Sequence, residues 1–121
     1  MAEKNMNLSN NISVIIPVVR PESALDCITS VKKHLPNAEI ISMNDTDGIG
    51  CPAMVEMLTK KATRDWILFL GDDTEVEEGF EQALEEAIKT LPDEWGVVGI
   101  NTQPENYLAH WLAHKKMRKI V

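Results

Sequence analysis

The 121-residue sequence contains only two cysteines, Cys27 and Cys51, which are too few for a disulfide framework. No apolar run approaches the roughly 18 residues that a membrane-spanning helix needs. The first residues, MAEKNMNLSNN, also lack the apolar segment of a signal peptide. These absences predict one domain over residues 1–121, located in the cytoplasm with reduced thiols.

Basic residues are scarce as well, because 12 Lys and Arg against 19 Asp and Glu give a net charge of −7. The segment 107–121 holds four of these cations and no acid, so the rest of the chain carries a charge of −11. An acidic body argues against nucleic-acid binding, which requires a basic face. The basic end is interpreted either as a solvated helix terminus or as a contact for a partner.

Short apolar runs rich in Ile, Val or aromatic residues alternate with helical patterns. The runs are residues 12–17, 39–43, 66–70 and 96–100, and the helical patterns are residues 21–35, 52–62, 78–91 and 106–120. Continuous apolar strands are typical of a sheet that is covered on both faces. The sequence therefore predicts an α/β fold of three layers, with a mainly parallel sheet of about four strands between helices.

Acidic residues follow two of these predicted strands. Asp45 and Asp47 come after the second strand, and Asp72 and Asp73 come after the third. In such folds ligands bind beyond the carboxyl ends of the strands. Two adjacent carboxylates repel each other, and a hard cation such as Mg²⁺ or Mn²⁺ relieves that repulsion while it binds substrate phosphates. The alternative is that the acids stabilise the N-terminus of the next helix.

Other interpretations of these motifs are weaker. NDTDGIG is turn-like, and counted from Asp45 it nearly matches a calcium-binding loop, but Ile49 stands where a ligand is needed. A phospho-receiver domain needs an acid pair after the first strand and a Lys near the last, and the segments VVRPE and NTQPE lack them. His110 and His114 are spaced to share a metal ion, whereas the competing interpretation is an amphipathic helix that packs on the sheet or forms a dimer contact.

In order and phase, the segments resemble the nucleotide-sugar-binding half of the family 2 glycosyltransferases, which have the Rossmann-like GT-A fold. The resemblance covers about residues 12 to 100. It rests on SVIIP (13–17), ALDCITSVKKH (24–34), ISMNDTDG (41–48) and KKATRDWILFLGDD (60–73). The last segment ends in a sequence similar to the DxD metal motif of that family.

The resemblance implies a role for each matching position. Pro17, Val18, Val19 and Arg20 match the segment that lines the nucleotide pocket, and Asp45 matches the acid that hydrogen-bonds the base. Asp72 matches the acid near the ribose. Asp73 matches the carboxylate that holds Mn²⁺ or Mg²⁺ against the diphosphate. The implied donor is a UDP- or GDP-sugar.

The sequence departs from the family in several respects, among them Asn44 where an Asp is common and the absence of the usual extra strand with its Arg-Asn phrase. IPVVR replaces the usual Thr-Tyr-Asn-like phrase, and the second half, which in the family binds the acceptor and supplies a catalytic base, is not evident, so no catalytic residue is assigned. Two functions follow. One is a metal-dependent glycosyltransferase whose acceptor site comes from a homo-oligomer or from a partner bound at the C-terminal helix. The other is a nucleotide- or metal-binding or protein-interaction module without transfer activity.

Overall fold

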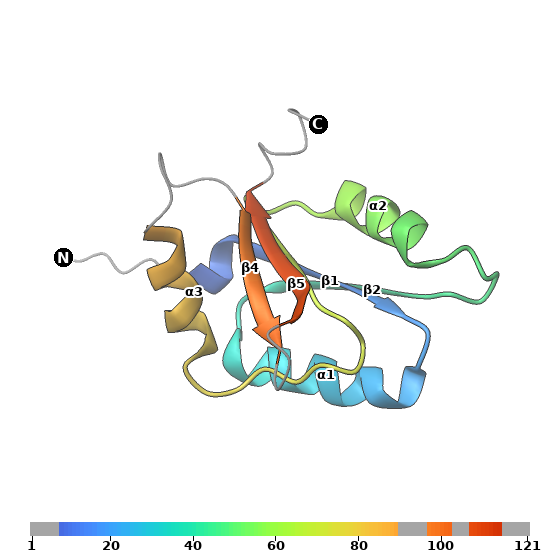
Figure 1. Ribbon diagram of the computed structural model, residues 1–121, viewed down its shortest axis with the longest axis horizontal. Coiled ribbons are helices and arrows are strands. Elements are labelled where there is room, and N and C mark those ends of the chain that lie inside the picture. The colour runs from blue at the N-terminus through green and yellow to red at the C-terminus, as the bar shows by residue number, and fades with distance from the viewer. Residues whose placement is uncertain (1–7, 90–96, 103–106, 115–121) are drawn as a thin grey trace.

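The computed structural model describes residues 8–89, 97–102 and 107–114, which form one sheet with helices on both faces (Figure 1). The elements in chain order are η1 (Leu8–Asn11), β1 (Ile12–Val18), α1 (Pro21–His34), β2 (Glu39–Asn44), α2 (Cys51–Lys61), β3 (Trp66–Phe69), α3 (Phe80–Lys89), β4 (Val97–Thr102) and β5 (Tyr107–His114). The predicted α/β class and layering are confirmed.

The sheet has the strand order β2-β1-β3-β5-β4. Strand β1 pairs in parallel with both β2 and β3, while β5 is antiparallel to its neighbours β3 and β4. Strand β4 therefore runs in the same direction as β1, β2 and β3. The four strands expected from the apolar runs are the four parallel ones, and β5 is inserted among them.

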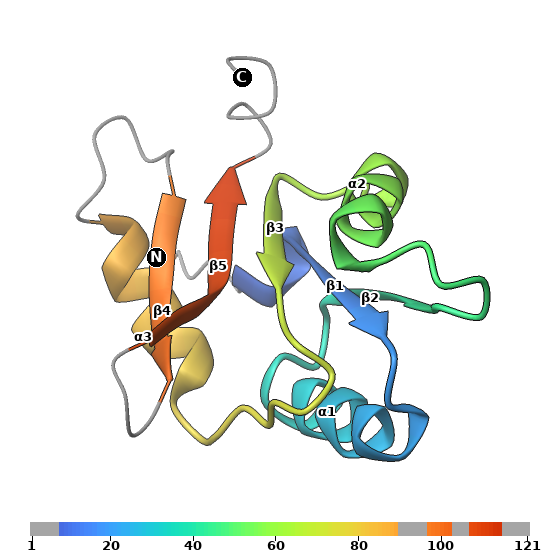
Figure 2. The same cartoon turned by 45° about the vertical axis from the view of Figure 1, so that its right-hand side comes forward.

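Strand β1 forms the centre of the core, since all seven of its residues are buried. Every second residue of β1, beginning with Ile12, faces one side of the sheet. These residues pack with α1, with Leu84 of α3 and with Trp66 of β3. The other face places Ile15 against Ile67 and against Leu58 of α2. This division puts α1 and α3 on one face and α2 on the other (Figure 2).

Pro17 lies near the end of this central strand without disrupting it. Ile15 accepts a hydrogen bond from the backbone of Leu70 on the β3 side, at 3.2 Å, whereas Val18 accepts one from Asp45 on the β2 side, at 2.8 Å. Because successive residues of a parallel strand face opposite neighbours, the missing N–H of Pro17 points toward β3. The last paired residues of β1 and β3 are Ile15 and Phe69, so the ladder between these strands ends just before the proline.

The expected helix at residues 106–120 is wrong for residues 107–114, which form β5. Leu and Ala are strong helix formers, and the apolar residues of YLAHWLAH fit a helical face as well as a strand. The position between β3 and β4 decides the outcome, because both of these neighbours supply backbone partners and Leu112 is fully buried. The basic residues 115–121 lie outside the described residues.

Candidate functional site at the carboxyl end of the sheet

Asp72 is a buried carboxylate at the point where the loops after β1 and β3 meet. Its side chain is only 2% exposed. One oxygen, Oδ2, accepts hydrogen bonds from the backbone N–H groups of Val19 at 2.8 Å and Arg20 at 2.7 Å. These amides immediately precede Pro21, the first residue of α1, so the carboxylate lies at the positive end of that helix. Asp72 thereby fastens the β3 loop to the start of α1.

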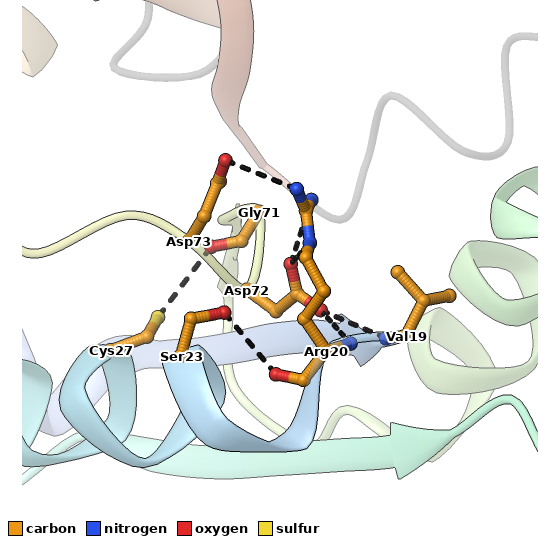
Figure 3. A network of polar contacts seen from close by, with 7 residues as sticks. All are labelled: Val19, Arg20, Ser23, Cys27, Gly71, Asp72 and Asp73. Atoms are coloured by element: carbon orange, nitrogen blue, oxygen red, sulfur yellow. Dashed lines mark hydrogen bonds and ion pairs between the residues drawn. The ribbon is translucent and has the colours of Figure 1, made fainter.

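The second oxygen of Asp72 binds the side chain of Arg20. Oδ1 accepts from Nε at 3.1 Å and lies 3.0 Å from Nη2. The guanidinium then extends to Asp73, where Nη1 is 3.5 Å from Oδ2 (Figure 3). Arg20 is 59% exposed and Asp73 is 57% exposed, in contrast to Asp72. A single cation therefore connects a buried acid to an exposed one.

The surroundings of Asp72 keep it ionised. Burial would raise the pKa of this carboxyl, but the backbone N–H groups of Arg20 and Val19 and the charge of the Arg20 guanidinium together lower the pKa below its ordinary value. A carboxylate with these contacts is already satisfied by the protein. Its predicted contact with a ribose stays a prediction.

Helix α1 also supports the loop that carries the two acids. The Sγ of Cys27 donates a hydrogen bond to the carbonyl oxygen of Gly71 at 3.6 Å, and Ser30 accepts one from the backbone N–H of Val76 at 3.0 Å through its Oγ. Burial, followed by the charges of Asp72 and Asp73, raises the pKa of the Cys27 thiol to about 11. The thiol is therefore neutral at neutral pH and acts as a fixed part of the loop support.

Asp45 lies at the end of β2 and orders the loop that leads into α2. Its Oδ1 accepts from the backbone N–H of Ile49 at 2.8 Å, and its Oδ2 accepts from that of Gly50 at 3.0 Å. Gly50 has φ 91°, a left-handed value that suits glycine. The backbone N–H of Asp45 also donates to Val18. The turn interpretation therefore describes the local structure, and the role of Asp45 toward a base stays a prediction.

The structure thus brings most of the predicted site residues to one edge. Asp45, Val18, Val19, Arg20 and Asp72 form a continuous chain of hydrogen bonds across the ends of β2, β1 and β3, and Asp73 joins it through Arg20. The side chains of Pro17 and Val18 are buried, so these two residues contribute backbone rather than a lining surface. Val19 is 57% exposed.

The fit of a divalent cation depends on Asp73. Among residues 8–89, 97–102 and 107–114, no group of three or more His, Cys, Asp or Glu side chains is placed to hold a metal ion. Asp73 is the exposed carboxylate of the pair, and a single carboxylate fits the mode in which phosphate oxygens and water supply the other ligands. His110 and His114 lie in β5 and not on a helix, and their side chains are outside the described part.

The helix-cap alternative for Asp72 and Asp73 is wrong for the helix that follows them. Helix α3 begins at Phe80, several residues beyond the acid pair. The residue directly before it is Gly79, whose carbonyl oxygen accepts a hydrogen bond from the backbone N–H of Ala83. What the pattern missed is Arg20 as the partner of both acids. The available signal was an arginine directly after the first strand in an acidic chain.

No protein-family model matches the sequence, and no curated protein matches it at a significant level. Among solved structures, the fold is similar to the Staphylococcus aureus glycosyltransferase TarS (residues 1–349), with a TM-score of 0.62 and 14% identity. That match covers 80% of this chain and 37% of TarS 1–349. The protein A197 from STIV matches with a TM-score of 0.53 and 14% identity, over 92% of this chain and 68% of that one.

The likeness shows that this chain shares its fold with part of TarS, and the chain spans just over a third of the TarS structure that it matches. In addition, none of the described helices has the length and apolar character required to cross a lipid bilayer.

Proposed function

We propose that this chain is a glycosyltransferase-like domain that binds a nucleoside-diphosphate sugar at the carboxyl end of its sheet. The observation that supports this most directly is the convergence of Asp45, Arg20, Asp72 and Asp73 at that edge, in a fold similar to TarS. Ligands of open α/β sheets bind at this edge. The proposed donor is a UDP- or GDP-sugar, and the proposed location is the cytoplasm.

Each residue has a proposed role toward the donor. Asp45 accepts a hydrogen bond from the base, Val19 and Arg20 border the nucleotide, and Asp72 lies near the ribose. Asp73 holds Mg²⁺ or Mn²⁺ against the diphosphate, where the cation would offset the charge of the leaving group. The exposure of Asp73 supports this assignment, since its carboxylate can be reached by a cation that arrives with the substrate.

The proposed reaction is transfer of the sugar to an acceptor hydroxyl. The bond between the acceptor oxygen and the anomeric carbon forms, the bond from that carbon to the diphosphate breaks, and the hydroxyl proton passes to a base that we do not assign. We propose that a second copy or a partner supplies the acceptor site. The C-terminal helix that was expected to contact such a partner is wrong for residues 107–114, because these residues form β5.

A nucleotide-binding module without transfer activity is the second candidate. Its support is the engagement of both oxygens of Asp72 by protein donors. The two candidates predict the same nucleotide binding. They differ in a release assay, because only the enzyme should liberate UDP or GDP from the corresponding sugar nucleotide.

Calorimetric titration of UDP and of GDP, with and without Mn²⁺, tests the proposed site. We expect binding of one nucleotide to strengthen with Mn²⁺. We expect Asp73→Ala to lose about tenfold or more in the Mn²⁺-dependent affinity, since removal of even an outer partner of a metal ligand costs about 10–100-fold. Asp26→Ala is the matched control, because Asp26 is an exposed acid on α1 that forms no hydrogen bond or ion pair with Arg20 or Asp72. Failure of wild type to bind either nucleotide under any of these conditions would refute the proposed function.

A further inference from the structure

We propose that the Arg20 guanidinium, held by Asp72, binds a diphosphate directly and without a divalent cation, and that Asp73 competes with the diphosphate for it. The inference rests on the proposed nucleotide site but not on sugar transfer. It makes Asp72 a positioning residue and Arg20 the group that contacts the ligand.

The first support is the way in which Arg20 is held. Both Nε and Nη2 contact Oδ1 of Asp72, at 3.1 and 3.0 Å, and the other oxygen of Asp72 is fixed by two backbone amides. The carboxylate is therefore held at both oxygens, and it constrains the orientation of the guanidinium plane. A guanidinium that is already oriented loses little freedom when it binds an anion.

The second support is the exposure of the Arg20 guanidinium to solvent. Arg20 is 59% exposed, while the carboxylate beneath it is 2% exposed. A guanidinium carries more N–H donors than its contacts to Asp72 and Asp73 use. Among residues 8–89, 97–102 and 107–114, the guanidinium makes polar contacts only with Asp72 and Asp73, and the fork geometry of its donors suits two oxygens of a phosphate group.

The third support is the contrast between the two acids. Nη1 lies 3.5 Å from Oδ2 of Asp73, longer than the roughly 2.7–2.9 Å of a strong charge-assisted hydrogen bond. Both side chains of this pair are more than half exposed, so solvent screens their attraction. An incoming phosphate can therefore replace Asp73 at Arg20 while the buried contact with Asp72 is kept.

Asp73 should thus have opposite effects with and without a metal ion. Without metal, its charge repels the diphosphate and occupies Nη1, so Asp73→Asn should tighten binding. With Mn²⁺, the same substitution removes the proposed cation ligand and should weaken binding. A purely structural role for Asp73 predicts no such reversal.

The test is calorimetric titration of UDP and of inorganic pyrophosphate in EDTA at low ionic strength. We expect Arg20→Gln to lose about tenfold or more in affinity, and Asp73→Asn to gain about threefold or more, as for the loss and gain of one phosphate-facing charge interaction. Lys60→Gln is the control that removes an equal charge elsewhere, since Lys60 is 73% exposed on α2 and pairs with Glu56. Arg20→Lys should recover only part of the loss, because it keeps the charge but not the fork.

Circular dichroism and thermal melting establish that each variant is folded. No binding of UDP or pyrophosphate by wild type in EDTA would overturn the inference, as would equal affinity of folded wild type and Arg20→Gln. Pyrophosphate binding that depends on Arg20, without any preference for UDP, would support the inference and count against the nucleotide site. UDP binding that requires Mn²⁺ and is unaffected by Arg20→Gln would support the proposed function and overturn the inference.

Discussion

The two ends of the parallel strands use similar residues for different purposes. At the amino end, Oε1 of Glu39 accepts hydrogen bonds from Ser13 Oγ at 2.5 Å and from the N–H and Oγ1 of Thr63 at 3.0 and 3.1 Å. Arg64 donates through Nη1 to the carbonyl oxygens of Asn10 and Asn37 at 2.6 and 3.3 Å. At the carboxyl end, Asp72 likewise accepts from backbone and side chain, but its arginine extends outward to an exposed acid.

The difference lies in what each arginine contacts. Arg64 is half-buried and its guanidinium donates to main-chain carbonyls, so it joins η1 and the loop before β2 to the start of β3. Arg20 is exposed, and its contacts are two carboxylates that face the loops of the predicted site. The hydrogen bonds from Arg64 to backbone carbonyl oxygens stabilise the fold. The exposed charges of Arg20 and Asp73 can instead bind an anion or a cation.

The largest expected effect on stability comes from Asp72→Ala. It removes a buried acceptor from two backbone amides and a guanidinium, and we expect the free energy of unfolding to fall by about 2–4 kcal/mol. Asp73→Ala, which removes only an exposed ion pair, should cost less than about 1 kcal/mol. Urea denaturation measures both, and equal losses would contradict the assignment of Asp72 as the anchor of this edge.

Glu39→Ala should have a smaller effect, at the amino end. It removes the shared acceptor of Ser13 and Thr63 in a half-buried position, and we expect a loss of about 1–2 kcal/mol. Nucleotide affinity should be unchanged, because this network lies at the opposite end of β1 from Arg20. A folded Glu39→Ala protein with weakened UDP binding would remove the functional distinction between the two ends.

The pH dependence of stability should reflect both carboxylates to a smaller extent. Burial raises each pKa, but hydrogen bonds from Ser13 and Thr63 to Glu39, and from Arg20 and Val19 to Asp72, lower the pKa values below the ordinary 4.5 and 3.8. Their stabilisation is therefore complete above those ordinary values and is lost as the pH falls through the lowered pKa values of the folded state. Urea midpoints should fall at acid pH in wild type, and less steeply in Glu39→Gln and in Asp72→Asn.

Much of the fold could be predicted from the sequence, because continuous Ile- and Val-rich runs such as ISVIIP are characteristic of strands covered on both faces. All four expected strands and the three helices between them are present. The segment 107–114 could not be assigned from its own residues, since Leu, Ala and Trp at these spacings suit a helix or a strand. Its pairing with both β3 and β4 determines the result.

The candidate site was predictable in its location but not in its contacts. Asp45, Asp72 and Asp73 follow strands that end at one edge, and that edge follows from the topology. Which of the two adjacent acids is buried could not be predicted. It depends on which carboxylate reaches the amides of Val19 and Arg20, which lie 53 and 52 positions away in the sequence. The sequence placed Arg20 in the segment that lines the predicted pocket. Its contacts with both Asp72 and Asp73 depend on the tertiary structure.

The most direct test compares the two arginines. UDP affinity would be measured by calorimetry in Mn²⁺ and in EDTA for wild type, Arg20→Gln and Arg64→Gln, each first shown to be folded. The account predicts that Arg20→Gln weakens UDP binding by about tenfold or more, whereas Arg64→Gln lowers stability and leaves affinity unchanged. Equal UDP affinities of the two variants, at either the wild-type or a reduced level, would contradict the claim that the carboxyl end alone binds the nucleotide.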